Sequence, residues 1–427
     1  MPLPTSLSLE RSSRSLREQI SFFLVILFAL AYKCNDALST PQFWAEDATV
    51  FFSDQFGHAW PQLFSPYAGY LHTLPRLVAW AASWLSPGKA PLIYNAAAIV
   101  LCALAIALTC RRLRNYLPSW IVALSFLAVP TSGEIFGTIT NAQWFLQFTM
   151  AAYCLAPAQE KSSTRASWLR AVGILLISLT GVFSTLLLIV VAGIAAAGWL
   201  AKRLSMAPFG GTLSRFIASR DAYAVGPLVV GALVQVCVLV THPPGEHEVV
   251  QPLLPAFKST FTQIVPIHTF GSDFLTGTTW LLLYAGVLAA LLWSRKVDGH
   301  ARLVVLGFLA LAAVECFAPM LRIADLTPMY SLGAADRYFY LMKVVAWWAL
   351  WLALNNGTKR SRLDATLTTT ALIMLVAVTN TQYLRRPSLV DLNWRGHSSV
   401  LDQPGTHTIP VNPGWSITVN VSAPTPP

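Results

Sequence analysis

Two adjacent carboxylates, Glu46 and Asp47, interrupt an otherwise aromatic and aliphatic stretch at residues 43–52. If this stretch is helical, Asp47 lies on the same apolar face as Phe43 and Phe51, whereas Glu46 lies on the more polar side. A carboxylate on an apolar face is costly unless the protein uses it, and desolvation strengthens its hold on a proton. Asp47 is therefore predicted to act as a general base, with Glu46 beside it. The alternative is that these acids only complement the dipole at a helix start.

Cationic groups elsewhere in the chain could complete a phosphate site. A guanidinium matches phosphate oxygens with its fork of N–H groups and stays charged in a low dielectric. The residues predicted to bind a phosphate are Arg337, Arg76, His72, Lys258 and Arg322. Two alternatives remain open: Arg337 marks an interfacial belt of aromatic and basic residues, and the pair at 72 and 76 forms the wet face of a surface helix.

A second set of side chains suits a sugar, because amides hydrogen-bond hydroxyls and an indole offers an apolar face. The residues predicted to bind a sugar or its acceptor are Glu134, Asn141, Gln143, Trp144 and Tyr338. Glu315 lies inside an apolar run, where a carboxylate is costly, so it is predicted to pair with a cation or to line a cavity.

Metal ligation is not predicted. His242, Glu246 and His247 have suitable chemistry, but the adjacent Pro-Pro-Gly indicates an ordinary loop. The six cysteines lack metal-ligand or redox spacing and are interpreted as packing residues.

The composition is that of a membrane protein. Only 11% of the 427 residues are charged, 55% are hydrophobic, and the mean hydropathy is +0.55. Soluble domains carry about a quarter charged residues, so the chain is predicted to cross a lipid bilayer several times. The formal charge of +10 would also fit nucleic acid, but Lys and Arg mainly set orientation in a membrane protein. No nucleic-acid partner is predicted.

Hydropathy predicts an all-α polytopic fold with about eleven transmembrane helices. The first is the run at 20–32, and the others lie at about 91–110, 117–132, 143–157, 168–181, 183–201, 222–241, 279–294, 302–320, 338–354 and 365–383. Every inner connection is basic if residues 1–19 are cytoplasmic, so the N-terminus is predicted inside and the C-terminus outside. The acidic pair and the long polar loops then lie outside the cytoplasm.

The membrane domain is predicted to cover 20–383, with a first outer loop at 34–90. Its first run is short enough for a cleaved signal peptide, but a retained anchor is favoured, with Lys33 snorkelling at its outer end. Residues 67–86 are predicted to form an interfacial helix, because a span there would place the basic cluster 111–114 outside.

The extracytoplasmic tail, 384–427, is polar and rich in proline. Within it, the alternation over 415–421 follows the turn signal Asn412-Pro413-Gly414 and predicts a small β-hairpin on the outer surface.

Several stretches of the chain resemble a bacterial branch of the C-type glycosyltransferase superfamily. They are 43–52, 66–76, Glu134 with 141–144, 335–340 and 409–415. Members are multipass enzymes that use polyprenyl-phosphate sugars, and the resemblance implies that Glu46-Asp47 is their acidic first-loop motif, which supplies the base. The chain departs from the pattern in having one acid, Glu134, in place of an Asp-x-Asp, which argues against a bound divalent metal. It also has no large soluble domain after the last helix.

The predicted function is transfer of a sugar from a polyprenyl phosphate to a cell-envelope glycan or lipid acceptor, at the outer face of a bacterial inner membrane. Displacement would invert the anomeric carbon, with Asp47 taking the acceptor proton and Arg337 stabilising the lipid phosphate. No cofactor is predicted.

Two other classes remain open. A lipid-linked saccharide flippase or a solute transporter should place charges near the bilayer midplane and repeat its two halves. Here the charges gather at one face, and no repeat is apparent. A polysaccharide polymerase or ligase would share that face with a glycosyltransferase.

Overall fold

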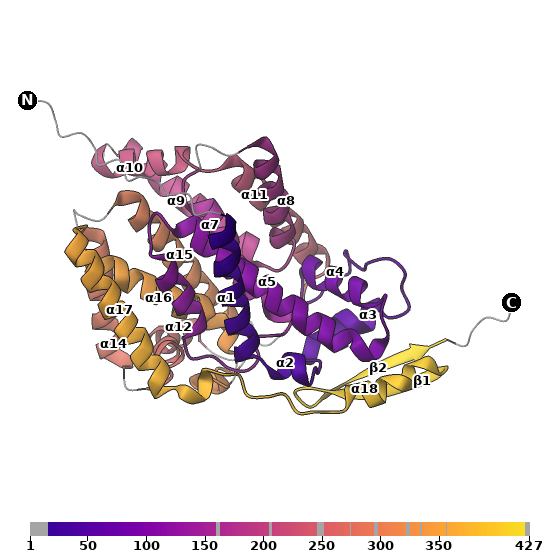
Figure 1. The fold of residues 1–427 in the computed structure, drawn as a ribbon. Helices are drawn as coiled ribbons and strands as arrows, with labels where there is room; N and C mark the ends of the chain where they lie inside the picture. The colour runs from indigo at the N-terminus through magenta and orange to yellow at the C-terminus, as the bar shows by residue number, and fades with distance from the viewer. Residues whose placement is uncertain are drawn as a thin grey trace, which may run out of the picture.

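The computed structural model describes residues 16–422 apart from 159–162, 205–206, 246–251, 274, 294–297, 322–324, 334 and 356. It is 71% helical and ends in a two-stranded sheet (Figure 1). The predicted helical fold with a terminal hairpin is confirmed. Most of the predicted N-terminal segment, 1–19, lies outside the described residues.

The elements of the N-terminal third are α1 (Leu16–Lys33), α2 (Asp36–Ser39), the π-helix η1 (Asp47–Phe52), α3 (Ser53–Gln55), α4 (Thr73–Ala82), η2 (Pro87–Lys89), α5 (Ala90–Leu113) and α6 (Ser119–Leu127). Those of the middle third are η3 (Thr140–Ala142), α7 (Gln143–Leu155), α8 (Thr164–Ser178), α9 (Phe183–Arg203), α10 (Ala207–Ala218), α11 (Ala222–Thr241), α12 (Leu253–Ser259), η4 (Thr260–Ile264), α13 (Val265–Phe270) and α14 (Gly277–Trp293). Those of the C-terminal third are α15 (Gly299–Phe317), η5 (Ala318–Leu321), η6 (Thr327–Tyr330), η7 (Asp336–Phe339), α16 (Tyr340–Leu354), α17 (Lys359–Thr379), η8 (Thr381–Tyr383), α18 (Trp394–His397), η9 (Ser398–Asp402), β1 (Gly405–Val411) and β2 (Trp415–Val421).

Helix α7 forms the centre of the bundle. It contacts α5, α8, α9, α11, α15 and α16, and all of its residues except Tyr153 are buried. A helix that is largely apolar all round is stable only where protein or lipid surrounds it. Beside it, the Tyr340 hydroxyl of α16 donates to the Phe126 carbonyl of α6 at 2.9 Å. The short helix α7 is therefore enclosed by longer ones, and a hydrogen bond joins α16 to α6 beside it.

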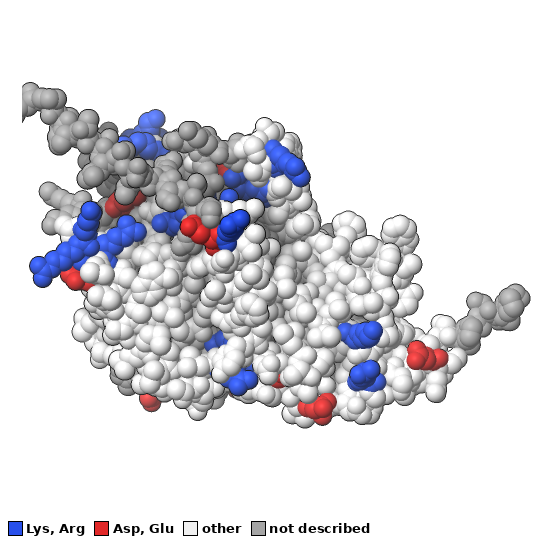
Figure 2. All heavy atoms as spheres, in the orientation of Figure 1, with Lys and Arg blue, Asp and Glu red and all other residues white. Residues whose placement is uncertain are grey.

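Among the described residues, the helices long and apolar enough to cross a membrane are Pro87–Leu113, Phe183–Arg203, Ala222–Thr241, Gly299–Leu321 and Lys359–Thr379. Each overlaps a predicted span, and together they support a membrane protein. The predicted number of about eleven spans is not confirmed. Figure 2 shows charged side chains in the upper and lower parts of one face and a largely uncharged band between them, as a surface facing lipid requires.

Several predicted spans correspond to shorter helices. Helix α6 has nine residues where 117–132 was predicted. At 1.5 Å per residue it covers about 14 Å, less than half of a hydrocarbon core of about 30 Å. The chain from 128 to 142 then runs as mostly irregular backbone, and only Gly133 and Glu134 in it are partly exposed. Such backbone is tolerated at membrane depth where protein surrounds it.

Lys33 does not snorkel toward solvent. It is buried, and its Nζ donates to the carbonyl oxygens of Leu127 at 3.1 Å and Tyr383 at 3.4 Å. The ammonium therefore joins the end of α1 to the last residue of α6 and to η8, which follows α17.

The helix predicted at 67–86 begins only at Thr73. The residues before it form a tight turn, because Ala68 and Gly69 have positive φ values of 53° and 86°. Positive φ at both central positions is typical of the primed hairpin turns. In α4, Arg76 faces the interior, so the alternative in which it lies on a wet surface is wrong.

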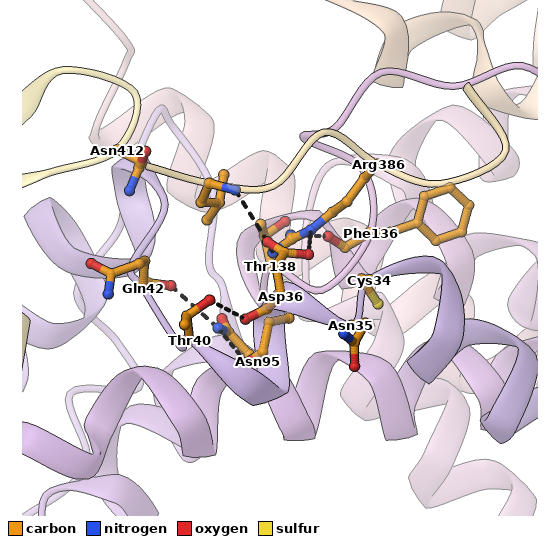
Figure 3. Close-up of polar contacts among 12 residues, drawn as sticks. Cys34, Asn35, Asp36, Thr40, Gln42, Asn95, Phe136, Thr138, Arg386 and Asn412 are labelled. Atoms are coloured by element: carbon orange, nitrogen blue, oxygen red, sulfur yellow. Dashed lines mark hydrogen bonds and ion pairs between the residues drawn. The ribbon is translucent and has the colours of Figure 1, made fainter. Parts of the chain in front are cut away.

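The C-terminal tail packs against α2 through a buried ion pair. The guanidinium of Arg386 donates to both carboxylate oxygens of Asp36, at 2.9 and 2.5 Å, and to the carbonyl of Phe136 at 2.6 Å (Figure 3). Asn95 donates to the carbonyl oxygens of Ala37 and Gln42 in the same cluster. Because a buried charge that loses its partner costs several kcal/mol, this ion pair fixes the tail relative to α2 and to the segment around Phe136.

The predicted hairpin is confirmed. Strands β1 and β2 are antiparallel, and Val411 pairs with Trp415 across a turn that contains a cis Asn412–Pro413 bond. Ile417 and Val419 are buried, as the alternation over 415–421 predicted, and Ile409 and Val411 of β1 are buried as well.

The predicted orientation can be tested by labelling single cysteines. The six native cysteines would first be replaced, and cysteine then introduced at His58, Tyr330 or Thr164, which are exposed. An impermeant thiol reagent should label intact cells at 58 and 330 but not at 164. Labelling at 164 with none at 58 and 330 would reverse the topology and put the acidic pair in the cytoplasm.

Candidate active site

One cavity collects most of the predicted site residues. It has a volume of about 490 Å³ and lies among the turn at 67–70, the start of α7, helices α9, α11 and α15, and η7. The predicted residues that line it are Glu46, His72, Asn141, Gln143, Trp144, Arg337 and Tyr338. This volume is in the range of sites for one small ligand.

Arg337 is held at the cavity wall by Glu134. Its Nη1 donates to Glu134 Oε2 at 2.8 Å, and its guanidinium lies 5.3 Å from the ring centroid of Tyr338. Burial lowers the pKa of Arg337, but the charges of Glu134 foremost, then Tyr338 and Glu46, outweigh burial and raise that pKa above its usual value. The guanidinium therefore remains a cation, as a phosphate site requires.

The neighbouring residue, Asp336, anchors the short helix that carries Arg337. Asp336 is fully buried; its Oδ1 lies 2.7 Å from His268 Nδ1 and pairs with Lys343, and its Oδ2 accepts from the Ser132 N–H at 2.9 Å. These partners come from three other segments of the chain. Moving η7 would break buried charged contacts, so the position of Arg337 is fixed by the core.

The two adjacent carboxylates lie on their predicted sides, with Asp47 buried and Glu46 partly exposed, but the cavity lies on the side of Glu46. Glu46 lines the cavity, and its side chain makes no hydrogen bond within the described residues. Asp47 is fully buried and does not line the cavity. Asp47 Oδ1 accepts from the N–H and hydroxyl of Thr140 at 2.9 and 2.5 Å, and Oδ2 accepts from the Ile139 N–H at 3.1 Å. Asp47 therefore caps η3 and is not among the lining residues, so the cavity geometry favours Glu46 over Asp47 for the role of general base. The alternative expected an acid at a helix start: Asp47 is the first residue of η1, and it also accepts from the N–H groups that begin η3.

The backbone turns just before the acidic pair. Ala45 has a φ of 33°, in the left-handed region, and the helix that follows is a π-helix. The Ala45 N–H donates to the carbonyl of Asn412 at 2.6 Å, and Trp44 pairs with the same tail residue. The C-terminal tail thus constrains the backbone just before Glu46 and Asp47. The local sequence pattern cannot predict this contact, because the tail is distant in the sequence.

The predicted sugar-binding amides present unpaired oxygens. Asn141 uses its NH₂ group to donate to the Glu134 carbonyl at 2.9 Å, and Gln143 donates to the Thr140 carbonyl at 3.0 Å. Their side-chain oxygens are buried without a hydrogen-bond partner. Buried polar atoms in proteins are nearly always paired, so these oxygens suit a ligand that supplies O–H or N–H groups.

Aromatic rings lie beside these amides. The ring of Trp144 lies 4.7 Å from that of Phe183 and 5.4 Å from that of Tyr338, measured between centroids. The indole is 7% exposed and lines the cavity. Trp144 is therefore a cavity residue rather than part of an outer belt.

His72 lines the cavity but cannot serve as a phosphate cation. Burial foremost, and the charge of Arg76, lower the pKa of His72 to about 3, so the ring is neutral near pH 7. The ring stacks on Tyr70 with centroids 4.5 Å apart, and its buried Nδ1 has no partner. A neutral imidazole of this kind suits a hydroxyl better than a phosphate.

The other predicted cations do not join the cavity lining. Arg76 is buried, and its Nη2 donates to Asp54 at 3.0 Å while its guanidinium lies 5.6 Å from the Phe51 ring. Lys258 is exposed on α12 and is not among the lining residues. Arg322 lies outside the described residues. The phosphate role therefore falls to Arg337 among the described predicted cations.

Tyr67 and Gln235 are among the lining residues that the sequence did not place in the site. Tyr67 enters through the tight turn, for which the following Ala68 and Gly69 gave only a weak signal. Gln235 of α11 holds that turn by accepting from the Leu71 N–H at 2.8 Å. Glu315 lines the cavity, as one of its two predicted roles required.

The part of the chain that the structure describes contains no group of three or more His, Cys, Asp or Glu side chains arranged to hold a metal. Glu246 and His247, the sequence candidates for a metal site, lie outside that part.

The buried Asp47 should make stability depend on pH. Burial raises the pKa of Asp47 to about 7, although hydrogen bonds from Thr140 and Ile139 oppose that rise. An unfolded aspartate titrates near about 4. Between these values the folded state binds more protons, so the free energy of unfolding should fall, by roughly 4 kcal/mol in all, as the pH rises from about 4 to above 7.

Thermal unfolding in detergent between pH 5 and 8 checks this. Asp47→Asn should remove this component of the pH dependence, whereas Asp402→Asn, at an exposed position, should leave it intact. If Asp47→Asn kept the full wild-type dependence of thermal stability on pH, another group would be responsible for that dependence.

Comparison with protein-family models, with curated proteins and with solved structures found no match to this chain.

Proposed function

We propose that this protein is a membrane glycosyltransferase that moves a sugar from a polyprenyl-phosphate donor to a cell-envelope glycan or lipid acceptor. The observation that carries this proposal is one cavity that combines the carboxylate of Glu46, the permanent cation of Arg337 and unpaired amide oxygens beside an indole. Displacing a lipid phosphate from a sugar needs a proton acceptor, a charge partner for the leaving group and groups that bind hydroxyls.

In the proposed reaction, an acceptor hydroxyl oxygen attacks the anomeric carbon on the face opposite the lipid phosphate. Glu46 takes the hydroxyl proton as the new C–O bond forms. The bond to the phosphate oxygen breaks, and its electron pair leaves with the polyprenyl phosphate, which Arg337 stabilises. Attack opposite the leaving group inverts the anomeric carbon.

The cavity also has an apolar side that suits a lipid chain. Leu186 of α9 and Leu239 of α11 line it, and both helices are long and apolar enough to span the membrane. A prenyl chain lying along these helices would keep its apolar groups in the bilayer while its phosphate reaches Arg337. This arrangement favours a lipid-linked donor over a soluble nucleotide sugar.

Deleting the gene in a bacterium that carries it tests the proposal. A polyprenyl-phosphate sugar should accumulate in the outer leaflet, where an impermeant oxidant such as periodate reaches it, and wild-type protein should clear it. Accumulation in the inner leaflet would instead indicate a flippase. A lipid-linked pool that does not change would contradict both functions.

A further inference from the structure

Glu315 is a buried carboxyl group without a charge partner. It lies on α15, inside the apolar segment Gly299–Leu321, and is 2% exposed. Its Oε1 accepts a hydrogen bond from Gln147 Nε2 at 3.2 Å, and its Oε2 is buried with no hydrogen-bond partner. No cation among the described residues forms an ion pair with it. An incompletely paired carboxyl group in a membrane-spanning helix is costly and marks functional residues more often than structural ones.

A second buried carboxyl group shows what a structural role looks like in this protein. Asp336 is fully buried, and both of its oxygens are occupied, by Lys343, His268 and the backbone of Ser132. Glu315 lacks such a set of partners, yet it lines the cavity that contains Trp144 and Arg337. The contrast indicates that the missing partner of Glu315 is a ligand rather than another part of the fold.

We infer that Glu315 binds a hydroxyl group of the ligand at the membrane-embedded wall of the cavity and thereby selects among sugars. The identity of that ligand as a lipid-linked sugar rests on the proposed function. A hydroxyl can both donate and accept, so it satisfies Oε2 whether the carboxyl group is ionised or protonated. Sites that hydrogen-bond a ligand hydroxyl reject analogues lacking it much more strongly than apolar pockets do, because the site is left with an unpaired polar atom. Glu315 is therefore a binding and specificity residue, and it takes no part in proton transfer.

Stability and binding of variants separate this role from a structural one. Glu315→Met keeps the length of the side chain and removes the unpaired oxygen, so its Tm in detergent should equal or exceed that of wild type. Asp336→Asn is the matched control at a fully paired carboxylate, and its Tm should fall by several degrees. A comparable fall in Glu315→Met would make Glu315 structural and would overturn the inference.

Binding is measured as the thermal shift caused by polyprenyl-phosphate glucose, mannose, galactose and arabinose and by their monodeoxy analogues. Wild type should bind one sugar at least tenfold more tightly than its analogue deoxygenated at one position. Glu315→Met should lose that preference, and Glu315→Gln should keep part of it. Equal discrimination by wild type and Glu315→Met would contradict the inference. If Glu315→Met is as stable as wild type and no lipid-linked sugar raises the Tm of wild type, the proposed donor is wrong. The stability result would still favour a ligand role for Glu315.

Discussion

Arg337→Ala is expected to lower the rate of sugar transfer by about a hundredfold or more. Charge-assisted hydrogen bonds to a phosphate in a largely desolvated site contribute a few kcal/mol, and alanine removes both the charge and the donors. Arg337→Lys keeps the charge but loses the planar fork, so we expect a loss of about tenfold. The measurement is transfer by purified variants at matched protein concentration.

Removing Arg337 also leaves Glu134, whose side chain is 11% exposed, without its ion-pair partner. The double variant Arg337→Ala with Glu134→Gln therefore controls for an unpaired carboxylate. It should restore stability but not transfer. Transfer at the wild-type rate by Arg337→Ala would reduce this arginine to a residue of the interfacial belt.

Glu46→Gln should lose about a hundredfold or more in rate, because glutamine keeps the shape of the side chain but cannot accept the acceptor proton. Asp47→Asn provides the matched comparison at the adjacent carboxylate. It should lower stability by disturbing the cap on η3, yet at matched folded protein it should retain much more transfer activity than Glu46→Gln. The reverse order of losses would return the role of base to Asp47 and would contradict the structural assignment.

The parts of the fold that depend on local sequence were predictable. The long apolar helices follow from continuous runs of hydrophobic residues, and the hairpin strand at 415–421 follows from the alternation of its side chains. The short core helices were not predictable in length, because their ends are set by surrounding protein rather than by the thickness of a bilayer. Helices α12 and α13 were also missed, since they lie in a stretch that hydropathy assigned to an outer loop.

In the site, too, residue types were predictable from the sequence, whereas contacts between distant segments were not. Residue chemistry pointed to Glu46, Trp144 and Arg337, which the cavity brings together from distant segments. Local periodicity gave the buried and exposed sides of the acidic pair correctly, but it could not show that the cavity lies on the side of Glu46, because distant segments form that cavity. Arg76 was misassigned because its partner, Asp54, lies outside the helix from which its exposure was judged.

The central claim is that the cavity around Glu46 and Arg337 transfers a sugar from a polyprenyl phosphate. The most direct measurement reconstitutes the purified protein in vesicles with a radiolabelled polyprenyl-phosphate sugar and an acceptor extract, and follows both the label and the lipid phosphate. Wild type should move label to the acceptor, release polyprenyl phosphate and invert the anomeric carbon. Glu46→Gln should show no detectable transfer of label and no detectable release of polyprenyl phosphate. Movement of intact donor between leaflets, with no release of polyprenyl phosphate by wild type, would contradict the account.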